Sequence, residues 1–349
     1  MPGTTSTNPN PPTMRSLFQP DIQSTKLILR ERPVPAPNFD ADEHLIRVHA
    51  ASICSGELLW AKLFPHPSLK VKEHVPCTDF AGTVEQAPPS SPFRPGDAVY
   101  GRTDYGRAGN GRDFTIAVTS ELAHVPSRLS WAEAVSAPVS AETAWQALFV
   151  QADLPPPTLA ADNTVTRSLN GTSVLVTAAS GSVGAWVVQL AHAAGAHVVG
   201  TCGPDNIDYV RSLGAAEVLD YRATDVPAWA AADGSRNRVD VVIDCSVGAK
   251  SLSEMWWCVK DGGVLLSIHQ PPEGVRPKDE SIAKNVRHGF FIMETNGSQL
   301  GRVSPFLNSG ACRPIVDSIW PLERYEEAFE KVGSGHCRGK VVFDMDVRS

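Results

Sequence analysis

The chain has 349 residues, of which 42% are hydrophobic and 20% charged, and its formal net charge is −7. This composition is typical of a globular protein with one large or two ordinary domains, and the acidic balance disfavours a nucleic-acid partner, because a phosphate-binding surface needs basic residues. The seven cysteines form no Cys-X-X-Cys pair, so we expect free thiols in a reducing compartment and predict a cytoplasmic location.

Residues 1–13, MPGTTSTNPNPPT, lack the apolar run of a signal peptide and the arginines of a transit peptide, so we expect a disordered tail. Further along, no charged residue occurs between Arg167 and Asp205, a stretch long enough to span a bilayer. Glycines, serines and histidines interrupt it, so we predict a buried strand, turn and helix, with no membrane span.

Short runs rich in β-branched residues, separated by Pro/Gly turns, predict a barrel or sandwich in the first third of the chain. These predicted strands are residues 26–31, 44–52, 80–87, 97–101 and 113–119. Ser130 and Glu133 form a capping box that predicts a helix start, and we expect Pro138 to end that helix. A second helix contains Trp145–Val150, and the Pro-rich residues 154–171 that follow it predict a surface loop.

Strands and helices alternate from Ser173 onward, which predicts a doubly wound parallel sheet. The predicted strands begin at residues 173, 197, 217, 239, 262 and 289. The predicted helices are residues 183–194, 206–213, 226–232, 252–260 and 299–307. From Arg313 the chain returns to a β pattern, so we expect a discontinuous first domain.

A turn of small residues, AASGSVG at 178–184, follows the first of these strands and opens a helix. Small residues let the backbone approach a pyrophosphate, and the amino end of a helix attracts negative charge. The turn therefore predicts a dinucleotide site at Ser180, Gly181, Ser182 and Val183, although alanine replaces the first glycine of GxGxxG. The alternative is an ordinary glycine that packs a helix on a strand.

The end of the second strand, Gly200–Pro204, has no carboxylate before Asp205, so nothing there repels a ribose 2′-phosphate. We therefore predict NADPH as the cofactor. Because this turn also lacks lysine and arginine, we expect backbone N–H groups, Asn206, and Tyr221 or Arg222 to hold the phosphate.

The runs VLVTAASGSVGAWVVQLAHAAGAHVVGTC, VDVVIDCSVG, DGGVLLSI and ERYEEAFEKVGSGHCRGKVV resemble the zinc-free quinone-oxidoreductase (zeta-crystallin-like) branch of the medium-chain dehydrogenase/reductases, in a fungal-type member. The resemblance covers residues 14–347. It implies a GroES-like β-barrel catalytic domain at 14–139 and 298–349, a Rossmann NADP-binding domain at 140–297, and a nicotinamide in the cleft between them. The cofactor residues implied are Ser180, Gly181, Ser182, Val183, Cys202, Gly203, Asn206, Tyr221, Ser246, Val247, His269, Phe291, Ile292 and Lys340.

Zinc-dependent relatives bind their metal through three residues, whose positions in this chain match Cys54, Thr78 and a residue near Val139. Threonine and valine do not supply the ligands that zinc needs. Residues 104–114, where those relatives carry a structural zinc, contain no cysteine. We therefore expect no metal, with Cys54 a small buried thiol.

Without a metal, an alcohol is a poor substrate, because nothing stabilises its alkoxide. A quinone or a conjugated enone or enoyl compound is a better substrate, because hydrogen bonds can stabilise the charge that develops on its oxygen when it accepts a hydride. The candidate catalytic residues are Glu57, Glu142 and Thr143. Thr143 matches a threonine near the nicotinamide in relatives, and either glutamate is a candidate acid or base if burial raises its pKa. The structural alternatives are solvated or paired glutamates and a threonine that only packs.

We thus expect the substrate to be a hydrophobic conjugated carbonyl compound. A role in fungal secondary metabolism and assembly into a homodimer are both possible from the sequence. Two other functions stay open: a redox-neutral tailoring enzyme in which a glutamate moves protons and NADP(H) is structural, and an NADPH-binding protein with little turnover.

Overall fold

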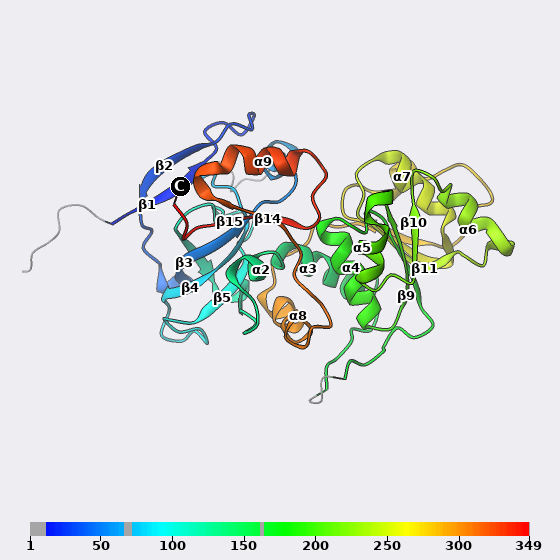
Figure 1. Ribbon diagram of the computed structural model, residues 1–349, viewed down its shortest axis with the longest axis horizontal. Helices are drawn as coiled ribbons and strands as arrows, with labels where there is room; N and C mark the ends of the chain where they lie inside the picture. Colours follow the sequence, from blue (N-terminus) through cyan, green and yellow to red (C-terminus); the bar gives the residue numbers. More distant parts are fainter. Residues whose placement is uncertain (1–11, 66–71, 161–163, 349) are drawn as a thin grey trace, which may run out of the picture.

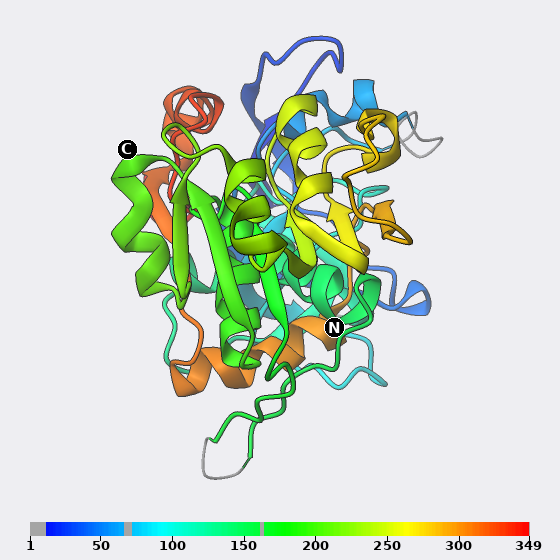
Figure 2. The same ribbon diagram turned by 90° about the vertical axis from the view of Figure 1, so that its right-hand side faces the viewer.

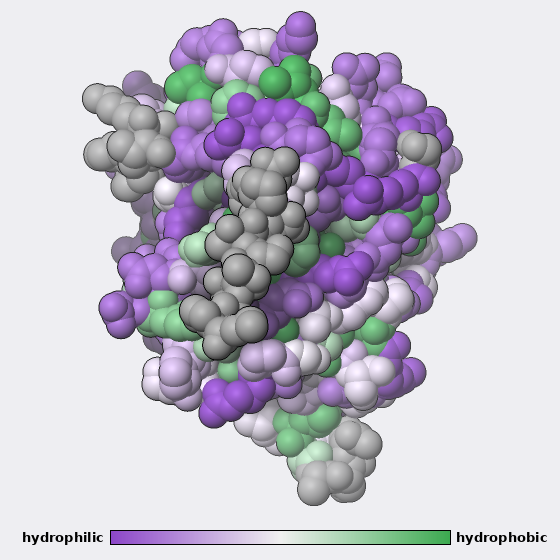
Figure 3. Space-filling model, turned by 90° about the vertical axis from the view of Figure 1, so that its left-hand side faces the viewer, coloured by the Kyte–Doolittle hydropathy of each residue, from purple (hydrophilic) through white to green (hydrophobic). Residues whose placement is uncertain are grey.

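The computed structural model describes residues 12–65, 72–160 and 164–348. Two lobes lie side by side, one rich in β-strands and one with a sheet covered by helices, and α2, α3 and α8 lie between them (Figure 1). The face of the β-rich lobe that points away from the other lobe is mainly hydrophilic, with small separate hydrophobic patches (Figure 3).

The β-rich lobe contains a seven-stranded sheet with strand order β14-β15-β3-β4-β5-β7, and β6 pairs with β3. Its strands are β3 (Glu43–Ser52), β4 (Asp79–Gln86), β5 (Ala98–Arg102), β6 (Phe114–Val118), β7 (Leu122–His124), β14 (Val316–Pro321) and β15 (Lys340–Asp344). The C-terminal β15 runs antiparallel to β3, with Val342 opposite Ser52, so both ends of the chain build one sheet. This confirms the expected discontinuous fold.

A separate two-stranded sheet pairs β1 (Thr13–Phe18) with β2 (Ile28–Pro33). Thr13 is thus the first residue of a strand that the sequence pattern did not predict. Residues 1–11 of the expected tail lie outside the described residues.

The second lobe holds six parallel strands in the order β10-β9-β8-β11-β12-β13. They are β8 (Ser173–Val176), β9 (His197–Cys202), β10 (Glu217–Asp220), β11 (Val239–Asp244), β12 (Val259–Ser267) and β13 (Arg287–Phe290). The order reverses between β8 and β11, which is where an open parallel sheet binds its ligand. Helices cover this sheet (Figure 2): α4 (Ser182–Ala193), α5 (Ile207–Ser212), α6 (Val226–Ser235) and α7 (Ala249–Glu254).

The uncharged stretch between Arg167 and Asp205 forms β8, a turn, α4 and β9, as predicted. It is apolar because all three elements are buried in the core, where Leu175 on β8, Trp186 on α4 and Val198 on β9 have no exposed surface. Within the described part of the chain, no helix has the length and hydropathy needed to cross a membrane.

Two predicted helix ends are wrong. Pro138 does not end α2 (Trp131–Val135) but is the first residue of α3 (Pro138–Trp145), a position where its missing N–H costs nothing. α3 continues as a π-helix over Gln146–Gln151. The helix predicted at 252–260 stops earlier, because Val259 already pairs with Val239 in the parallel sheet.

The remaining helices are α1 (Glu57–Leu63), α8 (Gly297–Ser309) and α9 (Tyr325–Gly333). α8 contacts β7 of the first lobe as well as α3, so the segment that leaves β13 ties the two lobes together.

Candidate active site

The turn between β8 and α4 is shaped for a close approach by a ligand. Ala178 has a left-handed φ of 47°, and a Cβ at Gly184 would collide with the backbone oxygen of Ala178. Gly181 is the N-cap of α4 and no side chain caps the helix, so its first N–H groups stay available to an anion. These features fit the pyrophosphate of a dinucleotide.

Ser182 links this turn to the β-rich lobe. Its hydroxyl donates to the carbonyl oxygen of Gly339 at 2.9 Å. The next residue, Lys340, sends a buried ammonium away from the turn, to Asp79 at 3.0 Å and to the sulfur of Cys54 at 3.1 Å. Lys340, predicted to bind the cofactor, therefore has its charged group held by the β-rich lobe.

The residues around Lys340 come from the ends of neighbouring strands, with Ser52 at the end of β3 and Asp79 at the start of β4. Asp79 accepts hydrogen bonds from the hydroxyl of Ser52 at 2.9 Å and from the N–H of Val139 at 3.0 Å. Burial would lower the pKa of Lys340, but Asp79 and Cys54 outweigh it and raise that pKa. Burial raises the pKa of the Cys54 thiol to about 11, so this thiol stays protonated at neutral pH.

The sulfur of Cys54 also lies 3.6 Å from the hydroxyl of Thr78. Among the residues that the structure describes, no group of three or more His, Cys, Asp or Glu side chains is placed to hold a metal ion.

Glu57, the first residue of α1, binds the backbone of two loops, one at Cys54 and one at Cys77. Its carboxyl oxygens accept from the N–H of Cys54 at 3.2 Å and from the N–H of Cys77 at 2.9 Å. Burial raises the pKa of Glu57 to about 7, against the opposing charge of Lys340. Both oxygens are therefore engaged in holding backbone, although Glu57 also lines a pocket with Thr78.

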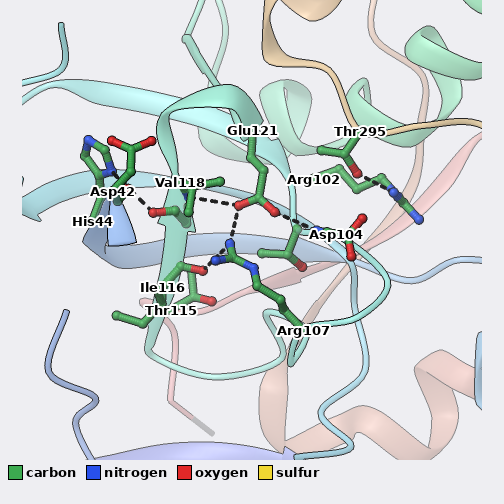
Figure 4. A network of polar contacts seen from close by, with 12 residues as sticks. Asp42, His44, Arg102, Asp104, Arg107, Thr115, Ile116, Val118, Glu121 and Thr295 are labelled. Atoms are coloured by element: carbon green, nitrogen blue, oxygen red, sulfur yellow. Dashed lines mark hydrogen bonds and ion pairs between the residues drawn. The ribbon is translucent and has the colours of Figure 1, made fainter. Parts of the chain in front are cut away.

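Glu142 lies on α3 between the lobes and is fully buried. One carboxyl oxygen accepts from the N–H of Asn296 at 3.3 Å, and the other has no hydrogen-bond partner among the described residues. Burial raises the pKa of Glu142 to about 8, while Arg102 opposes the shift. Arg102 itself donates to Thr295, next to Asn296 (Figure 4).

Thr143, the neighbour of Glu142, donates its hydroxyl to the carbonyl of Val139 at 2.5 Å within α3. That hydroxyl is thus partly occupied inside its own helix.

The raised pKa of Glu142 predicts a stability effect with a definite sign. The folded protein favours the protonated acid, so Glu142 costs little at low pH and destabilises the fold as pH rises from about 4.5, its ordinary value, through about 8. We expect Glu142→Gln to match wild type near pH 5 and to have a higher free energy of unfolding than wild type near pH 9. Urea unfolding at both pH values measures this difference. An equal difference at the two pH values would contradict the assignment.

The remaining predicted cofactor residues gather at the carboxyl edge of the parallel sheet. Ser246 and Val247 follow β11, and Val247 is 83% exposed. His269 follows β12 and its ring lies 3.2 Å from the carbonyl of Cys245. Phe291 and Ile292 follow β13, and Ile292 is exposed.

Asp244 organises this edge. It accepts hydrogen bonds from Thr177, at 2.6 Å, and from Ser246, at 2.7 Å. The hydroxyl of Ser267 is a further donor to it, at 3.2 Å. The ends of β8, β11 and β12 are thereby joined just beside the glycine turn.

At the end of β9, Cys202 is buried and the next residue, Gly203, is half-buried. Tyr221 is exposed, and the guanidinium of Arg222 lies over its ring, 5.7 Å from the centroid.

Arg338, which was not predicted to bind the cofactor, lies beside Asp205 and Asn206, just after β9. We call this group of residues the corner at the end of β9. The guanidinium of Arg338 donates to the side chain of Asn206 at 2.5 Å and to the carbonyl of Asp205 at 2.7 Å. It lies more than 130 residues along the chain from those partners, so no local pattern could place it. The only signal was a basic residue just before Gly339 and Lys340.

Comparisons with known proteins agree with this architecture. The alcohol dehydrogenase GroES-like domain family matches residues 40–140, and the zinc-binding dehydrogenase family matches residues 213–343. A "Probable zinc-binding oxidoreductase, mitochondrial" of Arthroderma benhamiae is 50% identical over 96% of this chain and 98% of its own. A "Chloroplast envelope quinone oxidoreductase homolog" of Arabidopsis thaliana is 30% identical, over 89% of this chain and 92% of its own.

A third relative, "NAD(P)H oxidoreductase RTN4IP1, mitochondrial" of Danio rerio, is 30% identical over 72% of this chain and 67% of its own. Among solved structures, a putative zinc-dependent alcohol dehydrogenase of Rhizobium etli superposes with a TM-score of 0.80 at 25% identity, covering 97% of this chain and 100% of its own.

A GroES-like lobe joined to a parallel six-stranded sheet defines an oxidoreductase architecture. The chain belongs to the medium-chain dehydrogenase/reductase superfamily, in its quinone-oxidoreductase branch. The expected cytoplasmic location is contradicted by these relatives, since the 50% identical protein is named mitochondrial and others are named mitochondrial or chloroplastic.

Proposed function

We propose that the chain is an NADPH-dependent oxidoreductase that reduces a quinone or a conjugated enone or enoyl compound without zinc. The observation that carries the proposal is a continuous path of contacts from the glycine turn to a pocket. Ser182 contacts Gly339, Lys340 contacts Cys54, and Cys54 contacts Thr78, which lines the pocket. A dinucleotide held at the turn would therefore lie within reach of a substrate in that pocket.

The choice of NADPH rests on the corner at the end of β9. Arg338 and Arg222 are the charged donors there, and a 2′-phosphate is the anion that distinguishes NADPH from NADH. We propose that Arg338 binds this phosphate while Asn206 orients its guanidinium. When bound, NADPH would supply the hydride, and the protein would supply its orientation.

Replacing Arg338 tests this choice directly. We expect Arg338→Leu to weaken NADPH binding by about tenfold or more, the loss typical of one charge-assisted hydrogen bond, and to leave NADH binding unchanged. Fluorescence titration of both dinucleotides measures this. Arg324→Leu is the matched control, because Arg324 is an exposed arginine in an ion pair with Glu327. A parallel loss for NADH and NADPH in Arg338→Leu would refute the assignment.

The absence of a catalytic zinc is proposed from the side chains at the site. Thr78 stands beside Cys54, and the ammonium group of Lys340 lies 3.1 Å from the sulfur of Cys54. Val139, the third matching position, has no metal-binding side chain, and its N–H donates to Asp79. The cation beside Cys54 repels a metal ion, and a thiol of raised pKa is a poor zinc ligand.

The assay mixes protein dialysed against a chelator with NADPH and a panel of quinones and enones, and follows NADPH absorbance together with product mass. NADPH loss with a gain of two hydrogens supports the proposal. An isomeric product without NADPH loss supports instead the redox-neutral enzyme, in which Glu57 or Glu142 would move the proton. Turnover that vanishes on dialysis and returns with zinc overturns the metal-free mechanism.

Two further properties are proposed. β13 is the edge strand of the six-stranded sheet, which is a surface suited to pairing with a second copy in a homodimer. The name of the 50% identical relative supports a mitochondrial location.

A further inference from the structure

The pocket beside Thr78 is lined by three side chains that have no role yet in the proposed function: Trp60, Lys72 and Tyr105. It opens between α1 and the segments around residues 72–78 and 105–109. Trp60 and Tyr105 form aromatic walls, with ring centroids 6.4 Å apart in an edge arrangement. Aromatic side chains at the edge of a pocket offer a surface on which a flat conjugated ligand can stack.

Lys72 is a cation of this pocket that forms no ion pair with the described residues, although Asp104 and Glu57 act on its charge from a longer distance. Its ammonium donates to the carbonyl of Tyr105 at 2.6 Å and lies 4.5 Å from the centroid of the same ring. No carboxylate lies within 4.0 Å of it among residues 12–65, 72–160 and 164–348. Because an ammonium has three N–H groups, two remain for a ligand. Burial lowers the pKa of Lys72 to about 8, although Asp104 opposes that shift.

The other cation that lines the pocket, Arg107, is already neutralised. Glu121 accepts from its guanidinium and also from the N–H groups of Val118, at 2.9 Å, and Asp104, at 2.7 Å (Figure 4). Burial raises the pKa of Glu121, against the charge of Arg107, yet this buried pair keeps the arginine fixed. Lys72 is therefore the lining cation that is not held in an ion pair among the described residues, while the carboxyl group of Glu57 lines the same pocket.

We propose that Lys72 binds the carbonyl oxygen of the substrate and protonates it during reduction, an inference that rests on the proposed function. The substrate is then a flat conjugated carbonyl compound whose ring or chain stacks against Trp60 or Tyr105 at the mouth of the pocket. NADPH, when bound, would supply the hydride, with one C–H bond of its dihydronicotinamide breaking as the substrate's new C–H bond forms. The π electrons would move to the carbonyl oxygen, and Nζ of Lys72 would give that oxygen a proton. The lysine regains its proton from water, so NADPH, one proton and the substrate yield NADP⁺ and the reduced product.

The first test needs no cofactor. para-Nitrophenol resembles the charged oxygen on a flat ring, and its visible absorbance reports whether it is ionised. We expect wild type to bind it as the phenolate, with the bound phenol ionising at lower pH than the free phenol. Lys72→Met should bind the phenolate about tenfold or more weakly, and Lys72→Arg should retain binding. Lys62→Met is the control, because Lys62 is an exposed lysine on α1 that does not line the pocket. Unchanged phenolate binding by Lys72→Met would overturn the proposal.

The second test separates proton donation from simple attraction. Since the protonated lysine is the active form, kcat/KM of wild type should fall as pH rises through about 8. Lys72→Arg keeps the charge but does not release a proton, so its rate should drop about 100-fold and the fall near this pH should disappear. A wild-type rate and pH profile in Lys72→Arg would overturn the acid role. If no substrate consumes NADPH, the proposed function fails, while the phenolate titration still decides whether Lys72 binds an oxyanion.

Discussion

Replacing Lys340 by methionine is expected to destabilise the protein by about 3–5 kcal/mol, the cost of removing one partner from a buried ion pair. The side chains of Lys340 and Asp79 are 4% and 0% exposed. The methionine would leave the buried carboxylate of Asp79 with the hydroxyl of Ser52 and the N–H of Val139 as its donors among the described residues. Urea unfolding followed by circular dichroism measures the change.

Two variants make the Lys340 result interpretable. Lys331→Met removes a lysine whose partner, Asp317, is 3.7 Å away in a partly exposed pair, and we expect it to cost about 1 kcal/mol or less. Adding Asp79→Asn to Lys340→Met removes the buried charge and should recover part of the lost stability. If Lys340→Met costs no more than Lys331→Met, the buried cluster does not stabilise the site as described.

Replacing Gly184 by valine should disable the turn that is expected to bind the pyrophosphate. A Cβ at this position meets the backbone of Ala178, which has no flexible atom to move aside. We expect a stability loss of about 1–3 kcal/mol and a fall in NADPH affinity of about tenfold or more, since the first turn of α4 must shift. Thermal unfolding and a fluorescence titration with NADPH measure the two effects.

Gly301 provides the matched control. It is exposed on α8, and a Cβ there meets no atom within 4 Å. Gly301→Ala should be neutral or stabilise the fold by about 0.4–1 kcal/mol, and should leave NADPH affinity unchanged. Wild-type NADPH affinity in a folded Gly184→Val protein would show that the turn does not hold the dinucleotide.

Local patterns were sufficient to predict the fold class. Alternating strands and helices from Ser173 onward gave the parallel sheet, because a buried strand and a helix have different hydrophobic periods. The capping box at Ser130 and Glu133 forms as predicted, with the hydroxyl of Ser130 accepting from the N–H of Glu133 at 3.4 Å. Where a local signal had two meanings, as at Pro138, the prediction was wrong, since proline either stops a helix or begins one.

The site was only partly predictable, because its chemistry depends on pairs far apart in the sequence. Glu57 and Glu142 were recognised as candidates, but their buried surroundings became visible only in three dimensions. Lys340 was expected at the cofactor, and its partnership with Asp79 crosses from one end of the chain to the other. Lys72 and Arg338 lie in segments without a regular pattern, so their roles could not be expected before the fold placed them.

Equilibrium titration of the wild-type protein with NADPH and with NADH tests the central claim most directly. The account predicts saturable binding of one NADPH per chain, with NADH bound about tenfold or more weakly because it lacks the 2′-phosphate that Arg338 would hold. Equal affinity for the two dinucleotides, or no saturable binding of either, would contradict it.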